Sequence, residues 1–238
     1  WNMWARNRSQ KKGIDFLLSL DVDIMCLQEL RHKTVEYVYK QKGYYVHTAV
    51  DHSFNDTLFY NAIVSKHKPS HNITRLYKTR IKRTFYPRLI GCKQCIEYQY
   101  GDYTMKSGKK VRVFNLHLVS TAGPTHRFRQ LKEICAYLSK GDNIMCGDFN
   151  SYAKLPWNVF FGWLFRYNVK DYLTNEINSL VEFADTHNMR LGVRNVVTQA
   201  FSRCHLDHIV VPAAWPQGTT TVYKKRFGAD HRLVVLEI

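Results

Sequence analysis

A carboxylate and a carboxamide stand two residues apart where a short apolar run of the sequence ends. Residues 144–146 have the length and composition of a buried strand, and Gly147 permits a turn directly after them. Asp148 and Asn150 then fall on the same side of an extended backbone. Such a pair can serve a hard cation and a phosphate oxygen. It also suits an ordinary Asx-rich turn, so this stretch alone leaves both interpretations open.

Polar residues of the same types recur at or near the ends of other apolar runs. They are Asn2, Glu29, His117, Asp207, Asp230 and His231. Taken singly, Glu29 also suits the entry to a helix, and His117 suits a satisfied place in the core. Asp207 and Asp230 also suit turns. Strand ends in a layered protein can converge on one pocket although they are far apart in sequence, so the recurrence favours a shared site.

A shared site requires strands that end together, and the hydrophobic pattern predicts many strands. Apolar or alternating runs predict strands at residues 22–27, 44–50, 57–65, 89–100, 111–119, 144–146, 207–211, 219–223 and 233–238. Helical spacing predicts helices at residues 8–20, 33–42, 124–139 and 175–187. We expect a polar turn at residues 51–56, and loop with an edge strand at residues 66–84. Strands dominate, which favours a layered α/β architecture with mixed or antiparallel sheets.

Six short motifs stand in the order and spacing of one known superfamily. They are Trp1-Asn2, Leu27-Gln28-Glu29, Asn115-Leu116-His117-Leu118, Gly147-Asp148-Phe149-Asn150, Leu206-Asp207-His208-Ile209 and Ala229-Asp230-His231-Arg232. With them, the chain resembles the endonuclease/exonuclease/phosphatase superfamily, which has the DNase I-like fold, over nearly its whole length. The resemblance implies a four-layered α/β sandwich, with two packed mixed or antiparallel sheets flanked by helices. It also implies one domain over residues 1–238, whose first strand is truncated at the N-terminus.

The resemblance further implies hydrolysis of phosphoesters with a divalent metal, Mg²⁺ or alternatively Mn²⁺. Glu29 is similar to the main metal ligand of the superfamily, and Asn2 and Asp230 are similar to nearby members of the metal and water network. Asp148 and Asn150 resemble the pair that orients the nucleophilic water and holds the phosphate. A hard cation held by carboxylates would stabilise the charge that builds on the phosphoryl oxygens.

Two histidines complete the site that the resemblance implies. Asp207 is similar to the carboxylate partner of His231, which would accept the proton of the attacking water near neutral pH. His117 resembles the second histidine of the DNase I-like and phosphatase branches, and a cationic His117 would donate to a phosphate oxygen or assist the leaving oxygen. Arg88 and Arg127 are candidates for further phosphate contacts, with a structural or surface role as the equal alternative.

The composition narrows the choice of substrate. The 238 residues include 35 Lys and Arg against 19 Asp and Glu, for a formal net charge of +16. Such a charge favours polyanions, so we expect a nuclease that acts on DNA, although an anionic membrane surface would also attract it. With 45% hydrophobic residues the chain can form a sizeable core, which excludes disorder.

Two alternatives differ in substrate or in chemistry. The aromatic stretch at residues 157–165 would suit a membrane interface, and would favour a phosphatase or phosphodiesterase on phospholipids, phosphoinositides or small phosphoesters. A basic binding module on an inactive scaffold is disfavoured, because none of the expected acidic or histidine positions is missing.

The surroundings of the protein are predicted only in outline. Nothing in the use of the six cysteines demands disulfides, so a reducing, cytoplasmic compartment and a monomer are the default expectations. The numbering starts at Trp1 and not at Met, which leaves an upstream signal or membrane anchor open. We expect the substrate to be chosen by loops at residues 51–56, 66–88 and 152–167.

Overall fold

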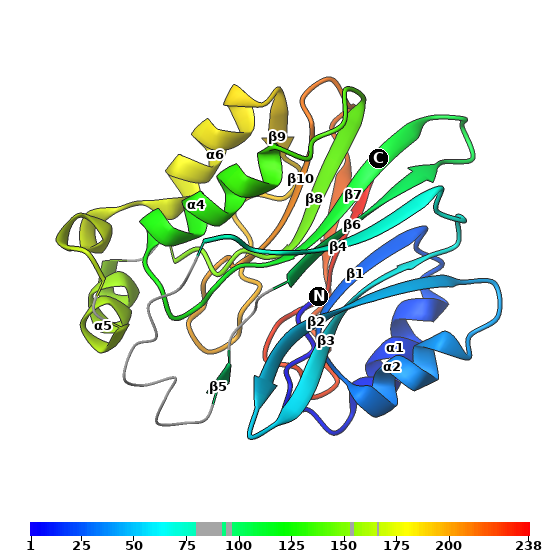
Figure 1. Ribbon diagram of the computed structural model, residues 1–238, viewed down its shortest axis with the longest axis horizontal. Coiled ribbons are helices and arrows are strands. Elements are labelled where there is room, and N and C mark those ends of the chain that lie inside the picture. The colour runs from blue at the N-terminus through cyan, green and yellow to red at the C-terminus, as the bar shows by residue number, and fades with distance from the viewer. Residues whose placement is uncertain (80–91, 94–96, 153–154, 166) are drawn as a thin grey trace.

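Two β-sheets packed face to face form the centre of the computed structural model, which describes residues 1–79, 92–93, 97–152, 155–165 and 167–238 (Figure 1). The four-stranded sheet consists, in spatial order, of β1 (Ile24–Arg31), β3 (Thr57–Ser65), β2 (Tyr45–Phe54) and β5 (Cys92–Lys93). The six-stranded sheet consists of β4 (His71–Leu76), β6 (Glu97–Thr104), β7 (Lys110–His117), β8 (Asp142–Asp148), β10 (Asp207–Pro212) and β9 (Met189–Leu191). Strands β11 (Thr219–Val222) and β12 (Val234–Glu237) pair with each other.

Helices cover the outer faces of both sheets, which gives the four layers that the resemblance implies (Figure 1). The four-stranded sheet is covered by α1 (Gln10–Ser19) and α2 (His32–Tyr39), and the six-stranded sheet by α4 (Pro124–Cys135) and α6 (Glu176–Thr186). Helix α5 (Leu155–Phe165) and the 3₁₀ helix η1 (Val169–Leu173) project from one end of the sandwich. Sequence explains where the helices begin: α4 has Pro124 in its first turn, and Asn175 caps α6 by accepting from the amides of Ile177 and Asn178.

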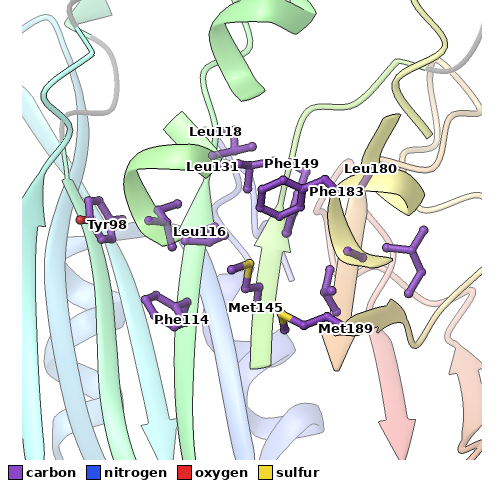
Figure 2. Packing of buried hydrophobic residues seen from close by; sticks show 14 of the residues in the cluster. Tyr98, Phe114, Leu116, Leu118, Leu131, Met145, Phe149, Leu180, Phe183 and Met189 are labelled. Carbon is purple, nitrogen blue, oxygen red and sulfur yellow. The ribbon is translucent and has the colours of Figure 1, made fainter. Parts of the chain in front are cut away.

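Apolar side chains between α4, α6 and the six-stranded sheet form the largest core cluster (Figure 2). Figure 2 shows Phe114 and Leu116 of β7 beside Met145 of β8, with Leu131 of α4 and Phe183 of α6 packed near them. A second cluster lies between α1, α2 and the four-stranded sheet. Because each helix buries one apolar face against a sheet, the strand ends are held in fixed relative positions.

A buried asparagine ties the two sheets together near the end where the polar motifs lie. Asn115 of β7 donates its side-chain amide to the carbonyl oxygens of Leu27 in β1 and Ala62 in β3, both at 3.0 Å. Its own Oδ1 accepts a hydrogen bond from Gln28 Nε2 at 2.6 Å. Buried amides that are satisfied in this way specify one relative placement of two elements.

Most predicted strands and helices are confirmed, but the predicted turn at residues 51–56 is wrong in extent. Strand β2 continues to Phe54, and the turn is confined to Asn55 and Asp56, both of which have positive φ. Ala49, Asp51 and Ser53 alternate on the buried side of this strand. Of the other loops expected to choose the substrate, residues 66–88 include β4 and extend beyond the described residues. Residues 155–165 within the third loop are helical.

No helix in the described part of the chain is long and apolar enough to cross a membrane.

Candidate active site

Three polar side chains meet because three neighbouring strands of the six-stranded sheet end in register. Strand β7 runs parallel to β8 with His117 opposite Asp148, and β10 runs antiparallel to β8 with Asp207 opposite Asp148. The helix α4 makes the crossover that a parallel β7–β8 pair requires. The sheet therefore brings together one histidine and two carboxylates that are separated in sequence by dozens of residues.

Gly147 allows this close register. It has a φ of 137°, and a Cβ at this position would lie 1.9 Å from the carbonyl oxygen of Leu116 in the neighbouring strand. Only glycine avoids that collision, as expected from the turn residue in the sequence motif. Asn150, three residues later, has a φ of 49°, and its backbone amide donates to Asp148 Oδ1 at 2.8 Å. One amide hydrogen of its side chain is donated to the carbonyl oxygen of Leu118 at 2.8 Å.

Glu29 enters the same site from the other sheet. The pairing of β1 with β3 is interrupted between Leu27 and Leu30, and Glu29 within this irregularity has a φ of 58°. Its carboxylate accepts from Asn2 Nδ2 at 3.0 Å and from the backbone amide of Ala5 at 2.7 Å. Positive φ in a non-glycine residue costs about 1–3 kcal/mol and is typically maintained at functional sites.

Asn2 links the two sheets at this point. Its Nδ2 donates both to Glu29 Oε1 and to Asp148 Oδ2, each at 3.0 Å. The backbone next to Asn2 pairs in parallel with β1. The backbone amide of Gln28 donates to the carbonyl oxygen of Trp1, and the backbone amide of Met3 donates to the carbonyl oxygen of Gln28. The short N-terminal motif is thus placed beside two carboxylates, as the sequence analysis expects.

His231 and Asp207 form a buried hydrogen-bonded pair. His231 donates from Nδ1 to Asp207 Oδ2 at 2.7 Å, and its Nε2 lies 3.8 Å from Asp148 Oδ2. Burial alone would lower the pKa of His231, but the charges of Asp207 and Asp148 outweigh it and raise this pKa to about 10. Burial would conversely raise the pKa of Asp207, and the charge of His231 outweighs it, so that the pKa of Asp207 falls to about 2.

The second histidine has its own carboxylate partner, which the sequence analysis missed. His117 Nδ1 lies 2.9 Å and 3.0 Å from the two carboxylate oxygens of Asp51, which is fully buried in β2. Asp51 also accepts from Asn61 Nδ2 at 3.1 Å and contacts His52 Nδ1 at 3.0 Å. Burial would raise the pKa of Asp51, but the charge and hydrogen bond of His117 dominate and hold it well below its ordinary value. No local signal in the sequence placed Asp51 inside, because Ala49, Asp51 and Ser53 form the buried side of β2 while the apolar Val50 lies on the other side.

The other nitrogen of His117 faces the rest of the site. Its Nε2 lies 4.0 Å from Glu29 Oε1 and 3.8 Å from Asp148 Oδ2. Asp148 Oδ2 is therefore 3.8 Å from the Nε2 atoms of both histidines. Burial is the main reason why the pKa of Asp148 is raised, and the negative charge of Asp207 adds to it.

Asp230 has a carboxylate oxygen that fits a metal ligand. Its Oδ1 is buried and has no hydrogen-bond partner among the described residues. Burial, followed by the negative charges of Glu29 and Asp148, raises the pKa of Asp230 to about 6. An oxygen-binding divalent cation would satisfy this atom and offset the crowded carboxylates, so the residues fit such an ion. The same cation would lower the pKa of His231 towards the range in which its ring accepts a proton.

A second group of possible ligands overlaps the first. One ligand atom each of Asp148, Asp207 and His231 lie within 4.8 Å of one another. His231 Nδ1 is committed to Asp207, however, which favours an ion pair at this position over two independent metal ligands. Glu29, Asn2 and Asp230 are the better candidates for holding a cation.

Comparison with models of protein families identifies the family of this chain. The model of the endonuclease/exonuclease/phosphatase family matches residues 1–231. The chain belongs to this family. Its members are in general hydrolases of phosphoesters that depend on divalent metals, and the site contains carboxylates and histidines suited to that class of reaction. A search of curated proteins finds no match.

Solved structures of the family share the fold of this chain at low sequence identity. The endonuclease/exonuclease/phosphatase from Beutenbergia cavernae superposes with a TM-score of 0.69 at 13% identity, over 94% of this chain. The match spans 64% of that chain, which is less than two thirds of its length. The human Nocturnin catalytic domain with bound sulfate gives a TM-score of 0.63 at 16% identity, over 100% of this chain and 91% of that one. D. rerio TDP2, complexed with single-strand DNA product, gives 0.62 at 14% identity, over 99% and 95%.

Of the two arginines that the sequence suggested as phosphate contacts, Arg127 does not join the site. Arg127 is 1% exposed and is bound through Nε and Nη2 to Glu176 at 2.8 Å and 2.7 Å. Its Nη1 donates to the carbonyl oxygens of Val119 and Ala122. The expected phosphate contact of Arg127 is therefore wrong, because its donors are used inside the protein. Arg88 lies outside the described residues.

Proposed function

We propose that the chain is a divalent-metal-dependent phosphodiesterase that cleaves nucleic acid, with DNA as its main substrate. The observation that supports the reaction is the convergence of Glu29, Asp148 and Asp230 with two histidines that are each backed by a buried carboxylate. Carboxylates serve a cation, and paired histidines serve proton transfer, so this set suits the hydrolysis of a phosphodiester.

Glu29, Asp230 and Asn2 would hold the cation, Mg²⁺ or Mn²⁺. When bound, that ion supplies positive charge for the phosphoryl oxygens of the transition state. The hydrogen bonds from Asn2 and from the amide of Ala5 orient the carboxylate of Glu29 for this role. The unpartnered Oδ1 of Asp230 offers a second oxygen ligand.

His231 takes the proton of the attacking water at Nε2. Asp207 holds the opposite nitrogen of the ring as a donor, which leaves Nε2 as the acceptor and stabilises the cation that forms. Asp148 Oδ2, 3.8 Å from that Nε2, orients the water. Asn150, whose position is set by its bonds to Asp148 and Leu118, donates the second hydrogen of its side-chain amide to a phosphate oxygen.

His117 acts as the cationic partner of the phosphate. Asp51 binds its Nδ1, which favours the protonated ring and directs Nε2 towards the site. From there it donates to a phosphoryl oxygen or to the leaving oxygen.

The formal net charge of +16 supports nucleic acid as the substrate. Lysine and arginine side chains that neutralise backbone phosphates release bound counterions, which makes such binding strong at low salt and weak at high salt.

Incubation with plasmid DNA and with single-stranded DNA tests this function directly. We expect cleavage in Mg²⁺ or Mn²⁺, none with chelator, and a steep decline as salt is raised. Glu29→Gln and His231→Ala serve as controls, since each removes one group of the proposed site. If the protein cleaves no more DNA than these two variants do, the proposal is wrong.

A second candidate is a phosphatase or phosphodiesterase of phospholipids, phosphoinositides or small phosphoesters. Helix α5 favours it, because residues 155–165 contain no charged side chain, and Val159, Phe160 and Trp163 of this helix are exposed. An apolar, aromatic face of this kind can enter a membrane interface. Flotation with liposomes, comparing the protein with Trp163→Ser, and a panel of phosphate substrates test it. Equal flotation of both proteins, with no release of phosphate or headgroup, would exclude it.

A further inference from the structure

Two exposed aromatic side chains lie on backbone segments that are bonded to the candidate active site. Trp4 is 39% exposed, and Phe201 is 78% exposed. Single exposed aromatic residues need no explanation. Among the aromatic residues that the structure describes as exposed, these two differ because hydrogen bonds connect their immediate neighbours to the residues that would perform the chemistry.

The segment of Trp4 is attached to the Glu29 half of the site. The amide of Trp4 donates to Asn2 Oδ1 at 2.9 Å, and the amide of Ala5 donates to Glu29 Oε2 at 2.7 Å. The carbonyl oxygen of Trp4 accepts from Gln10 Nε2 at 3.1 Å. Trp4 has a φ of 59°, so its ring is presented by a turn that these bonds maintain.

The segment of Phe201 is attached to the part of the site that contains Asp230 and His231. Gln199 pairs with His231, and the amide of Ala200 donates to the carbonyl oxygen of Asp230 at 2.9 Å. Trp157 Nε1 donates to the carbonyl oxygen of Ser202 at 3.0 Å, and its ring lies 5.7 Å from that of Phe201 between centroids. Phe201 is thus supported from behind while most of its surface stays open to solvent.

Basic side chains follow each of the two rings. Arg6 and Arg8 are exposed after Trp4, and Arg203 is exposed after Phe201. Proteins that bind single strands combine aromatic rings, on which bases stack, with basic groups that follow the phosphates. Both components are present in the segment of Trp4 and in the segment of Phe201.

We propose that Trp4 and Phe201 stack the nucleobases on the two sides of the phosphate that is cleaved, and so make the protein selective for single-stranded over duplex nucleic acid. This inference rests on the proposed function. In a duplex the bases are stacked on one another and their faces are covered, whereas an unpaired strand offers them. Because every base has an aromatic face, the selection concerns strandedness and tolerates sequence.

Fluorescence of 2-aminopurine tests the contact without any reaction. A single-stranded DNA oligonucleotide carries this base on one or the other side of its central phosphate, and it is mixed with the protein in chelator. We expect quenching on binding, because stacking quenches this base. We expect Phe201→Ala to restore the fluorescence on one side only and Trp4→Ala on the other, while Phe201→Tyr keeps the quenching.

Kinetics with Mg²⁺ provide the second measurement. For Phe201→Ala and Trp4→Ala, the ratio of kcat/KM for the oligonucleotide to that for bis(4-nitrophenyl) phosphate should fall about tenfold, mainly through KM, since one stacked base is lost. Trp163→Ala is the matched control. Trp163 is 74% exposed, but it lies on α5 beyond Trp157, the residue of this helix that contacts the Phe201 segment. We expect its ratio to equal that of the unchanged protein.

The outcomes separate this inference from the function on which it rests. Absence of any DNA cleavage would contradict the proposed function. Cleavage and quenching that are the same in Phe201→Ala and Trp4→Ala as in the unchanged protein would contradict the stacking proposal alone. If Phe201→Ala and Trp4→Ala lose binding to vesicles of anionic phospholipid but bind the oligonucleotide as the unchanged protein does, the two rings belong to a membrane interface. That result would also overturn the stacking proposal.

Discussion

Two buried ion pairs in this protein have similar geometry but leave different atoms available. Arg127–Glu176 and His231–Asp207 are both hidden from solvent, and each is joined at 2.7 Å. Every nitrogen of the Arg127 side chain donates inside the protein, and Glu176 also accepts from the amide of Tyr152 at 3.0 Å. His231, by contrast, uses one nitrogen in its pair, while the other faces Asp148 at 3.8 Å.

The difference lies in the atoms that remain available after the pair has formed. A pair that uses all its donors internally connects elements, here α4 with α6, and has nothing to offer a substrate. A pair that directs one nitrogen into a polar pocket is prepared for proton transfer. Burial and a short distance therefore do not distinguish a structural ion pair from a reactive one.

The largest effect is expected from His231→Asn. This change removes the proton acceptor while it keeps a polar side chain of similar size. We expect kcat for DNA cleavage to fall about a thousandfold, within the range that general acid–base catalysis contributes. Single-turnover kinetics with saturating Mg²⁺ measure it, and intact far-ultraviolet circular dichroism controls for folding. A decrease of less than tenfold would contradict the assignment of His231 as the base.

Arg127→Met should act on stability and leave the chemistry unchanged. It strands Glu176 without its partner in the interior, which typically costs about 3–5 kcal/mol of unfolding free energy. Urea denaturation measures this loss. The double variant Arg127→Met/Glu176→Met should recover most of it, because no charge is then buried alone. If kcat of the folded single variant drops as far as in His231→Asn, the distinction between the two pairs is wrong.

Asp51→Asn tests whether the second histidine belongs with the reactive pair. The substitution removes the negative charge that favours protonated His117 but keeps a hydrogen-bonding side chain. We expect kcat to fall about 10–100-fold, since partners that orient catalytic groups typically contribute that much. Ser53→Ala, on the same buried side of β2, is the control. Equal kcat values for the two variants would remove Asp51 from the site.

His208 should produce the smallest effect, and only in acid. Burial lowers the pKa of His208 well below its ordinary value of 6.5, and its Nε2 is hydrogen-bonded to Ser151 Oγ at 2.7 Å. The folded state then binds fewer protons than the unfolded state. Stability is therefore full above pH 6.5 and declines as the pH falls below it, by at most about 1.4 kcal/mol per pH unit.

Chemical denaturation between pH 7.5 and 5 measures this slope, and His208→Gln should make it shallower. A slope that is equal in the two proteins would show that His208 does not remain neutral when folded. The comparison matters because His208 directly follows Asp207, yet its ring faces the core while Asp207 faces His231.

Local patterns in the sequence were sufficient to predict most elements of the fold. The apolar run before Gly147, the strand at residues 57–65 and the helix that begins at Pro124 are confirmed, because each carries an apolar run or an apolar spacing typical of its element. The error at residues 51–56 has a physical reason as well. Asp51 looks like a turn residue by composition, but its burial is stabilised by His117, which lies 66 residues away in the chain.

The sequence by itself determined which polar residues are available for chemistry. They are carboxylates, amides and histidines at strand ends, in a recognisable order. Only the tertiary structure decided which of them are partners. The register of β7, β8 and β10 aligns His117, Asp148 and Asp207, and His231, which is bridged to Gln199, bonds to Asp207. The approach of the two sheets pairs His117 with Asp51, and the packing of α4 on α6 removes Arg127 from the site. These pairings depend on contacts between residues that are distant in sequence, and no local spacing encodes them.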